Sequence, residues 1–542
     1  MYTSRFPVSL SRPAAVLSAL ALALAACEQA PSAEAGDDQQ LIAGVCKVND
    51  ELTKKAMTAT KLKALKDPVA ELVLKAAGGC PVNLDEITSK LRKTDAVNCK
   101  DDPAQPPAGT ATRFVSERSQ ALKQADSYRL VISRTCNSRS NHELLMSVFG
   151  VGADVQKLPT DLEMIGFDKT AGVFNYYARE NNAWRFFGSS IDLIADGYTC
   201  NSVGSCVPKA ASKTRCAGCH LGGGLIIKEF DSPWVHWEHF TDTPGAKELM
   251  DRFKMTLGAQ KDDGAGLEST VRNGNRLWNE KRVDFLKTKG TQELLRPLFC
   301  TVDLNLQSMT SSTNSVPSSV RNDFFFDPRL GGFDSVSIDS ADYTALTSAN
   351  GQAVKDSSGS PLKDKDGKVV TDTIFAWTYP ERGQADRDYV DQLVNKKLVD
   401  DDFVGDVLRI DMGRPIFSGQ RCNLLKFAPV LTAAQMTPAA IRDGFKKNLA
   451  GKTDPGAAQL LAALGDTADL SKHKEVATKF LAACKARPRK DFLNDALAWS
   501  GTLRNTIRSS VGLIEFAESM ASDKFDGKTD NRNWDLATCT LK

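Results

Sequence analysis

The sequence predicts a mainly α-helical, multidomain chain with one small antiparallel β element. Apolar residues recur at helical spacing over residues 51–77 and again after Thr432, whereas residues 162–194 contain three short runs rich in aromatic residues. The 542 residues, less an N-terminal targeting segment of 27, leave about 515, which is too long for a single hydrophobic core. We therefore expect two to four domains.

Residues 1–27 predict an export signal. Arg5 and Arg12 form a sparse positive region, and Ala14–Ala26 is an apolar run too short to span a bilayer comfortably. The run ends in Leu-Ala-Ala-Cys27, which resembles the lipobox of bacterial lipoproteins. The resemblance implies cleavage before Cys27, its lipidation, and anchoring on the periplasmic side of the outer membrane or at the cell surface. An ordinary signal peptide with cleavage near Ala-x-Ala is the alternative.

The mature chain carries no net charge. The sequence contains 69 Lys+Arg and 67 Asp+Glu, and the targeting segment holds two of the basic residues and none of the acidic ones, so 67 of each remain. Nucleic-acid binding requires a basic surface, so we expect no nucleic-acid partner. The sequence also lacks the Gly-x-Ser-x-Gly, Walker and His-Glu-x-x-His motifs of hydrolytic and nucleotide chemistry.

The segments before residue 200 divide into a tether, a helical region and a β region. Residues 28–40 have no aliphatic side chain larger than Ala, which is typical of a flexible linker. Glu51–Ala77 has helical apolar spacing interrupted at Pro68. The expected divisions are 28–45 as tether, 46–150 as a helical N-terminal region and 151–200 as a small antiparallel β region.

The β region is predicted from three strand-like runs and one turn. Asn181-Asn182 separates the last two runs and is a favourable hairpin turn. Aromatic residues dominate the runs, and we expect them to form the core of the sheet. The runs are Met164–Phe167, Val173–Tyr177 and Ala183–Phe187.

The most specific motif in the chain is Cys216-Ala217-Gly218-Cys219-His220. Two thiols three positions apart can add to the two vinyl groups of a porphyrin, and the next imidazole can ligate its iron. On these five residues the chain resembles bacterial monohaem c-type cytochromes. The resemblance implies one covalent haem c, with Cys216 and Cys219 as thioether anchors and His220 as the proximal ligand, in a cytochrome c-like helical segment over residues 201–310.

Three other interpretations of the motif remain open. A thioredoxin-like redox pair also uses C-x-x-C, but it requires a preceding strand and a βαβ frame, whereas residues 199–215 are polar and loop-like. A zinc site could use Cys200 and Cys206 together with the two motif cysteines. A chance match is possible in a chain with 13 Cys. Export favours haem, because c-type attachment occurs outside the cytoplasmic membrane.

Residues after the motif could complete a haem pocket. Gly222 and Gly223 lack a Cβ and would let the backbone approach a flat cofactor, although a tight loop explains them equally well. Trp234 would supply an aromatic wall. The distal iron ligand is predicted as His236, which is flanked by two Trp residues that would keep it dry. The alternative distal ligands are Met255, His239 and Met250, and an open position is also possible.

Cysteine usage and the later segments complete the prediction. Without Cys27, Cys216 and Cys219, ten cysteines remain, enough for up to five disulfides in an oxidising compartment. We expect a local Cys200–Cys206 disulfide and a possible Cys484–Cys539 bridge. Residues 311–430 are expected to be mixed and loop-rich, and 431–542 to form a C-terminal helical region in which Thr437-Pro438 begins a helix.

The function that we expect is one-electron transfer by an envelope cytochrome to and from redox partner proteins. An electron carrier is favoured over an enzyme. The alternative enzyme would be a haem-dependent peroxidase or oxygenase with an open distal site, and the third possibility is a haem-containing surface scaffold.

Overall fold

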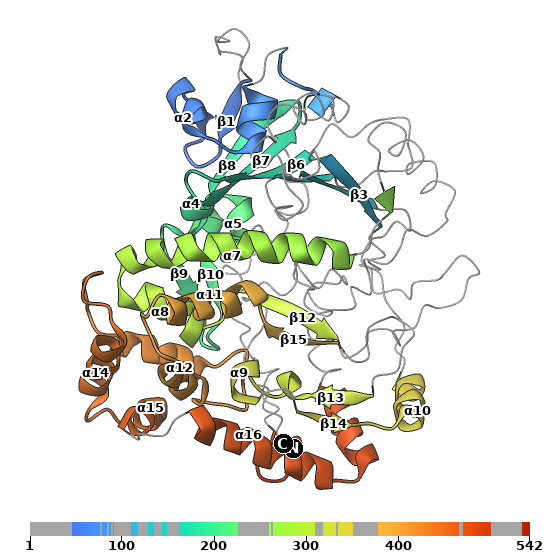
Figure 1. Cartoon of the computed structure of the whole chain (residues 1–542), viewed down its shortest axis with the longest axis vertical. Helices are drawn as coiled ribbons and strands as arrows, with labels where there is room; N and C mark the ends of the chain where they lie inside the picture. The colour runs from blue at the N-terminus through green and yellow to red at the C-terminus, as the bar shows by residue number, and fades with distance from the viewer. Residues whose placement is uncertain are drawn as a thin grey trace, which may run out of the picture.

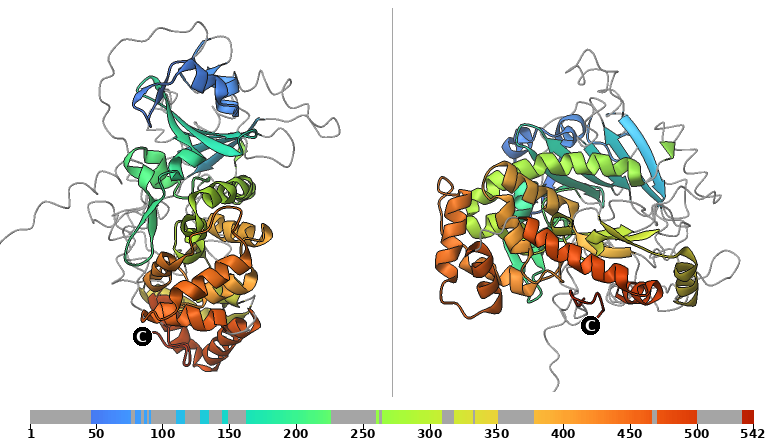
Figure 2. Two further views of the ribbon diagram at one scale, coloured as in Figure 1. Left: turned by 90° about the vertical axis from the view of Figure 1, so that its left-hand side faces the viewer. Right: turned by 60° about the horizontal axis from the view of Figure 1, so that its bottom comes forward.

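The computed structural model describes residues 46–75, 79–83, 86–87, 90, 110–116, 128–134, 144–148, 162–225, 260–261, 264–308, 318–331, 334–350, 378–465, 470–499 and 534–542. A twisted β-sheet forms one end of the molecule and a group of helices forms the other, with one long helix between them (Figure 1). The left-hand view of Figure 2, turned by 90° about the vertical axis, shows the same order from the sheet through the long helix to the helical end.

The described strands at the first end form a nine-stranded mixed sheet. Strands β3 to β8 are consecutive antiparallel neighbours, whereas β1 pairs in parallel with β8 and β11 pairs in parallel with β3. The strand order is β11-β3-β4-β5-β6-β7-β8-β1-β2. The strands are β1 Val48–Asp50, β2 Lys55–Ala56, β3 Thr110–Ser116, β4 Tyr128–Arg134, β5 Leu144–Val148, β6 Leu162–Asp168, β7 Val173–Glu180, β8 Ala183–Ser189 and β11 Gln260–Lys261.

The three predicted aromatic strands are confirmed as β6, β7 and β8. Glu180 pairs with Ala183, so Asn181 and Asn182 form a two-residue hairpin turn. Both asparagines have positive φ, 49° and 63°, as this turn requires and as Asn tolerates.

The prediction of a helical region over 46–150 is wrong. The described residues of this region include five strands of the sheet, β1 to β5. Their helical parts are short: α2 Ala59–Ala64, the π-helix η1 Val69–Leu74, and residues 86–87 and 90. Pro68 lies directly before η1, at the predicted break. β3 and β4 are rich in β-branched and aromatic residues, which favour strands, and they pair as neighbours over their full lengths.

The segment after the sheet contains the Cys-x-x-Cys-His motif and leads into the long helix. Two helices follow the motif, α7 Gly264–Lys289 and α8 Thr291–Phe299. Helix α7 packs against α8 and α11 on one side and contacts α4 and β7 on the other. The elements before α7 are α4 Ser190–Ile194, β9 Tyr198–Cys200, β10 Cys206–Pro208, η2 Lys209–Ser212 and α5 Arg215–Cys219.

The other end of the molecule is mainly helical, as predicted for residues after 431, and mixed over the described parts of 311–430. The predicted N-cap is confirmed, since the Thr437 side chain accepts a hydrogen bond from Ala440 N at 3.2 Å. A further helix covers residues 489–499. The named elements are β12 Leu304–Ser308, β13 Ser319–Arg321, η3 Asn322–Phe324, α9 Pro328–Gly331, β14 Ser335–Ser337, α10 Ser340–Asn350, β15 Thr378–Arg382, α11 Gln384–Asn395, α12 Asp401–Leu408, α13 Gly419–Asn423, η4 Leu424–Phe427, α14 Pro438–Leu449, α15 Pro455–Gly465 and α16 Leu470–Ala486.

One connected hydrophobic core joins the sheet, α7 and the helical end, running from Phe167 to Cys539. It includes a cluster of edge-to-face aromatic rings in which Phe325 contacts Phe480 and Trp534. Because the described residues share this core, the structure does not confirm the predicted division into several domains.

Four disulfides are present among the described cysteines. They are Cys46–Cys80, Cys200–Cys206, Cys300–Cys422 and Cys484–Cys539. The expected Cys200–Cys206 and Cys484–Cys539 pairs are therefore confirmed. Cys99 and Cys136, the remaining two of the ten, lie outside the described residues.

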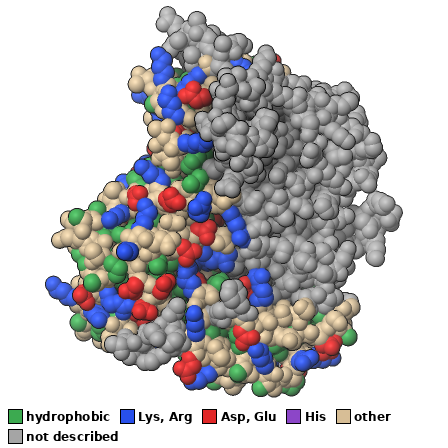
Figure 3. All heavy atoms as spheres, in the orientation of Figure 1, with side chains coloured by type: hydrophobic (Ala, Val, Ile, Leu, Met, Phe, Trp, Pro, Cys, Tyr) green, Lys and Arg blue, Asp and Glu red, His purple; other side chains and the backbone are tan. Residues whose placement is uncertain are grey.

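Lys/Arg and Asp/Glu side chains are interspersed on the described part of the face in Figure 3. Among the helices described, none combines the length and apolar composition needed to cross a bilayer. The predicted signal and the lipidation site at Cys27 lie outside the described residues.

Candidate functional site

The Cys-x-x-Cys-His motif lies on the short helix α5, which is fixed to the sheet at its first turn. Thr214, just before the helix, donates a hydrogen bond to Phe187 O of β8 at 3.0 Å. The Arg215 guanidinium lies over the Phe187 ring, 4.6 Å from its centroid, and forms ion pairs with Glu163 and Glu180. These contacts hold α5 against the face of β8.

Cys216 is an unpaired, half-buried cysteine. Its carbonyl accepts a hydrogen bond from His220 N at 2.7 Å, which closes one helical turn between the two residues. Burial raises the pKa of the Cys216 thiol, and the negative charge of Glu163 raises it further. The thiol therefore stays protonated at neutral pH. Cys219 is the last residue of α5.

His220 is oriented by the backbone that follows it. Its Nδ1 lies 2.8 Å from Gly224 O, and a carbonyl can only accept, so Nδ1 carries the proton. In the neutral ring Nε2 then carries the lone pair that a metal ligand needs. The half-buried imidazole also packs on Tyr176, with ring centroids 4.7 Å apart. A backbone carbonyl that fixes the tautomer and the ring orientation is the usual outer-shell partner of a metal-binding histidine.

Side chains from two distant elements hold the loop after His220. The Tyr176 hydroxyl, on β7, lies 2.9 Å from both Gly223 O and Gly224 O. Trp278, on α7, donates from Nε1 to Gly222 O at 2.8 Å. Asn275, one helical turn earlier, holds both backbone groups of Leu225: Oδ1 accepts from Leu225 N at 2.7 Å, and Nδ2 donates to Leu225 O at 3.1 Å. The carbonyl that orients His220 is therefore part of a buried, well-satisfied network.

The glycines of this loop are required by the surrounding protein. Gly223 has φ +70°, and a Cβ there would lie 2.6 Å from Ser190 O. A Cβ at Gly224 would lie 2.5 Å from Asn275 Oδ1, and one at Gly222 would lie 3.1 Å from the Arg282 side chain. These contacts account for a tight loop. Contact of Gly222 and Gly223 with a cofactor stays a prediction.

A buried ion pair lies beneath the loop. Arg282 Nη1 and Asp386 Oδ1 are 3.1 Å apart, and both side chains are fully buried. The second carboxylate oxygen, Oδ2, accepts from Val302 N and Asp303 N, and the guanidinium lies 4.7 Å from the centroid of the Tyr389 ring. The pair thus joins α7 to α11 directly under Gly222.

Most residues of the predicted haem pocket lie outside the part of the chain that the structure describes. The residues concerned are Trp234, His236, His239, Met250 and Met255, all between 226 and 259, where the structure is not described. The predicted distal ligand and aromatic wall therefore stay predictions.

The zinc alternative built on Cys200, Cys206, Cys216 and Cys219 is wrong. Cys200 and Cys206 form a disulfide with each other, and the cysteines that cluster with them are Cys300 and Cys422. The thioredoxin alternative also lacks its frame in the described residues, because the antiparallel pair β9–β10 precedes α5.

No protein-family model matches this chain, and no curated protein or solved structure shows significant similarity to it.

Proposed function

We propose that this protein is a cell-envelope monohaem c-type cytochrome that transfers single electrons between redox partner proteins. One observation carries the proposal: His220 directly follows two cysteines and is held by a hydrogen bond from Nδ1 to Gly224 O. This hydrogen bond favours the tautomer in which Nε2 carries the lone pair needed to ligate iron.

The residues present fit haem attachment on the proximal side. Cys216 is not consumed by a disulfide, and its thiol would form one thioether, with Cys219 forming the other. His220 would supply the iron ligand. When bound, haem c supplies a centre that accepts and releases one electron. The protein's part is to fix the imidazole, and it does so through the network of Tyr176 and Asn275.

Anchoring at the envelope rests on the sequence. The lipobox resemblance at Cys27 supports lipidation, and four disulfides are consistent with an oxidising compartment. A lipid-anchored carrier facing the periplasm or the cell exterior would meet partner proteins without crossing the membrane.

Ligand replacement tests the proposal. The full chain is expressed in a host that attaches haem c, and haem that survives denaturation is measured for the wild type, His220→Ala and the double variant Cys216→Ser/Cys219→Ser. We expect covalent haem in the wild type, loss of normal loading in His220→Ala, and none in the double variant. Equal covalent haem in all three would reject the proposed site.

A second measurement separates electron transfer from enzymatic activity. An electron carrier should give a low-spin spectrum that does not change on adding cyanide or peroxide, because both axial positions are filled. A high-spin spectrum with peroxide turnover would instead support the peroxidase alternative.

A further inference from the structure

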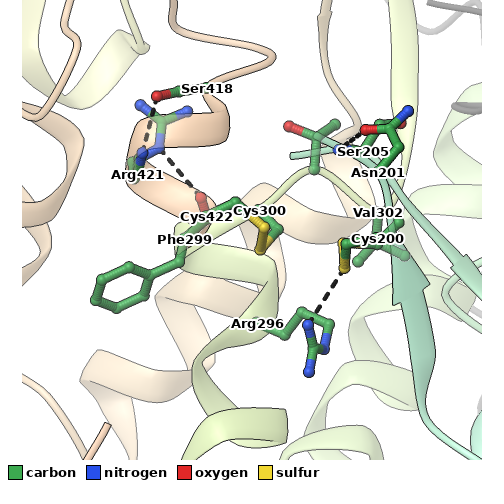
Figure 4. The surroundings of a disulfide bond; sticks show 12 residues. Cys200, Asn201, Ser205, Arg296, Phe299, Cys300, Val302, Ser418, Arg421 and Cys422 are labelled. Carbon is green, nitrogen blue, oxygen red and sulfur yellow. Dashed lines mark hydrogen bonds between the residues drawn. A yellow bond between two sulfur atoms is a disulfide. The ribbon is translucent and has the colours of Figure 1, made fainter. Parts of the chain in front are cut away.

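Four cysteines that the haem proposal does not use meet at one point. Cys200 and Cys206 form one disulfide across the β9–β10 pair, and Cys300 and Cys422 form another between the end of α8 and α13. The four sulfur atoms all lie within 4.8 Å of one another. Figure 4 shows the Cys300–Cys422 bond with Cys200 beside it.

The four sulfurs differ in their access to solvent. Cys206, Cys300 and Cys422 are buried, with 0%, 1% and 8% of their surface exposed. Cys200 is only half-buried. An external thiol would therefore reach the cluster through Cys200.

A cation lies beside this accessible sulfur. Arg296 Nη1 is 3.2 Å from Cys200 Sγ (Figure 4). Its other guanidinium nitrogens bind Glu293 at 2.9 and 2.5 Å. The carboxylate orients the guanidinium toward the sulfur, although it also offsets part of its charge. A neighbouring guanidinium stabilises a thiolate when the S–S bond breaks.

Tight backbone packing holds the two disulfides together. A Cβ at Gly204, in the loop between β9 and β10, would lie 2.7 Å from Ser418 O and 2.9 Å from Cys422 Cβ. The same loop is tied to the end of α8, where Thr301 N donates to Gly204 O and Cys206 N donates to Thr301 O, both at 2.9 Å. The sulfurs thus stay close without relying on a flexible segment.

Buried arginines fix the end of α8 that carries Cys300. Arg382 Nη1 donates to Pro297 O and Leu298 O at 2.9 and 3.1 Å, and Arg421 Nε donates to Phe299 O at 3.3 Å. These bonds satisfy the last carbonyls of the helix. Cys300 is therefore held in place on one side of the cluster, next to Cys422 on α13.

We propose that these four cysteines form one thiol–disulfide exchange centre, in which reduction of Cys200–Cys206 opens the buried Cys300–Cys422 bond. A dithiol attacks Cys200 Sγ and its second thiol resolves the mixed disulfide. The dithiol is oxidised by two electrons and loses two protons, and Cys200 and Cys206 become thiols. The thiolate of Cys200 or Cys206 then attacks Sγ of Cys300 or Cys422 and forms a new S–S bond with it. The unattacked cysteine of the Cys300–Cys422 pair leaves as a thiol, and the step involves no net electron change.

Exchange would alter the connection between the motif segment and the helical end. The Cys300–Cys422 bond closes a sequence separation of 122 residues and ties α13 to α8. The new bond would instead tie the β9–β10 hairpin to either α8 or α13. The hairpin ends seven residues before α5 begins. The proposal does not depend on haem and adds a second redox-active group to the chain.

Partial reduction of the full chain tests the proposal. The protein is treated with limiting dithiothreitol and a metal chelator, quenched in acid and alkylated, and thiols and disulfide-linked peptides are mapped by mass spectrometry. We expect thiols at Cys300 or Cys422 and a peptide that links one of them to Cys200 or Cys206. Cys484–Cys539 is the matched control, because it is equally buried, at 1% and 0% exposed, and should stay closed.

A variant measures the relay itself. In Cys200→Ser/Cys206→Ser the opening of Cys300–Cys422 should slow at least about tenfold, since a positioned intramolecular thiolate reacts far faster than a bulk thiol. An unchanged opening rate would overturn the proposal. Opening of Cys300–Cys422 and Cys484–Cys539 at the same rate in the wild type would also overturn the proposal, because it would indicate unfolding of the chain. If the variant does not fold, the absence of any cross-linked peptide from the partly reduced wild type is decisive against exchange.

Discussion

Replacing Tyr176 by Phe is the sharpest structural test of how the imidazole of His220 is held. Tyr176 is buried, and burial raises its pKa well above the usual value, so the hydroxyl remains a donor. It lies 2.9 Å from both Gly223 O and Gly224 O. The substitution deletes this donor and keeps the ring that packs on His220.

The free-energy cost of Tyr176→Phe depends on which hydrogen bonds Gly223 O and Gly224 O retain. Gly224 O keeps its hydrogen bond from His220 Nδ1, whereas no other donor to Gly223 O is found in the described part of the chain. One buried carbonyl is left without a partner, which costs about 1–3 kcal/mol. A loss of this size in the free energy of local loop opening should accelerate backbone amide exchange roughly 5- to 150-fold.

Hydrogen–deuterium exchange of residues 221–225 provides the assay. Gly223 N and Leu225 N donate to His220 O and Asn275 Oδ1, so their amides are protected until the loop opens. Tyr177→Phe is the control: this tyrosine is the next residue of β7, is equally buried, and donates to Asp67. Unaltered loop exchange in Tyr176→Phe, or equal acceleration in both variants, would refute the reasoning.

Two further predictions concern the loop and the pair beneath it. Gly224→Ala should lower haem loading and the protection of the loop amides from hydrogen exchange, because the new Cβ would lie 2.5 Å from Asn275 Oδ1. Gly218→Ala is the control and should behave as wild type, because its new Cβ would meet nothing within 4 Å. Equal haem content in the two purified variants would contradict this prediction. Asp386→Asn should destabilise the fold by about 3–5 kcal/mol in urea denaturation, because it leaves the fully buried Arg282 charge without its partner. A loss below about 1 kcal/mol, the range of an exposed pair, would show that the ion pair is not structural.

Local signals in the sequence located several elements correctly. Asn181-Asn182 marked a hairpin because few other residues tolerate two successive positive φ angles. Thr437-Pro438 marked a helix start because the side chain caps the first turn. Both signals depend on residues within one turn of the chain.

The long-range pairings carried no comparable signal. β1 lies more than 130 residues before its parallel partner β8. Strands β3, β4 and β5 instead pair with their neighbours along the chain, and the β-branched and aromatic residues of β3 and β4 are a local strand signal that the prediction of a helical region does not use.

The candidate site shows the same division. The five-residue motif is recognisable from its spacing alone, whereas the sequence places Tyr176 only in the core of the sheet. Asn275 and Trp278 lie more than 50 residues after the motif, on α7. The sulfur cluster was equally invisible, because Cys200 and Cys422 are brought together only by the folded core. Sequence spacing predicts the chemistry, and tertiary packing determines how its groups are held.

The most direct test of the central claim is the intact mass and visible spectrum of the exported protein, purified from a host that matures c-type cytochromes. We predict one covalently bound haem per chain, a reversible one-electron spectral change on reduction and reoxidation, and a mass that exceeds the lipidated polypeptide by one haem. A colourless product whose mass is that of the polypeptide and its lipid alone would contradict the account.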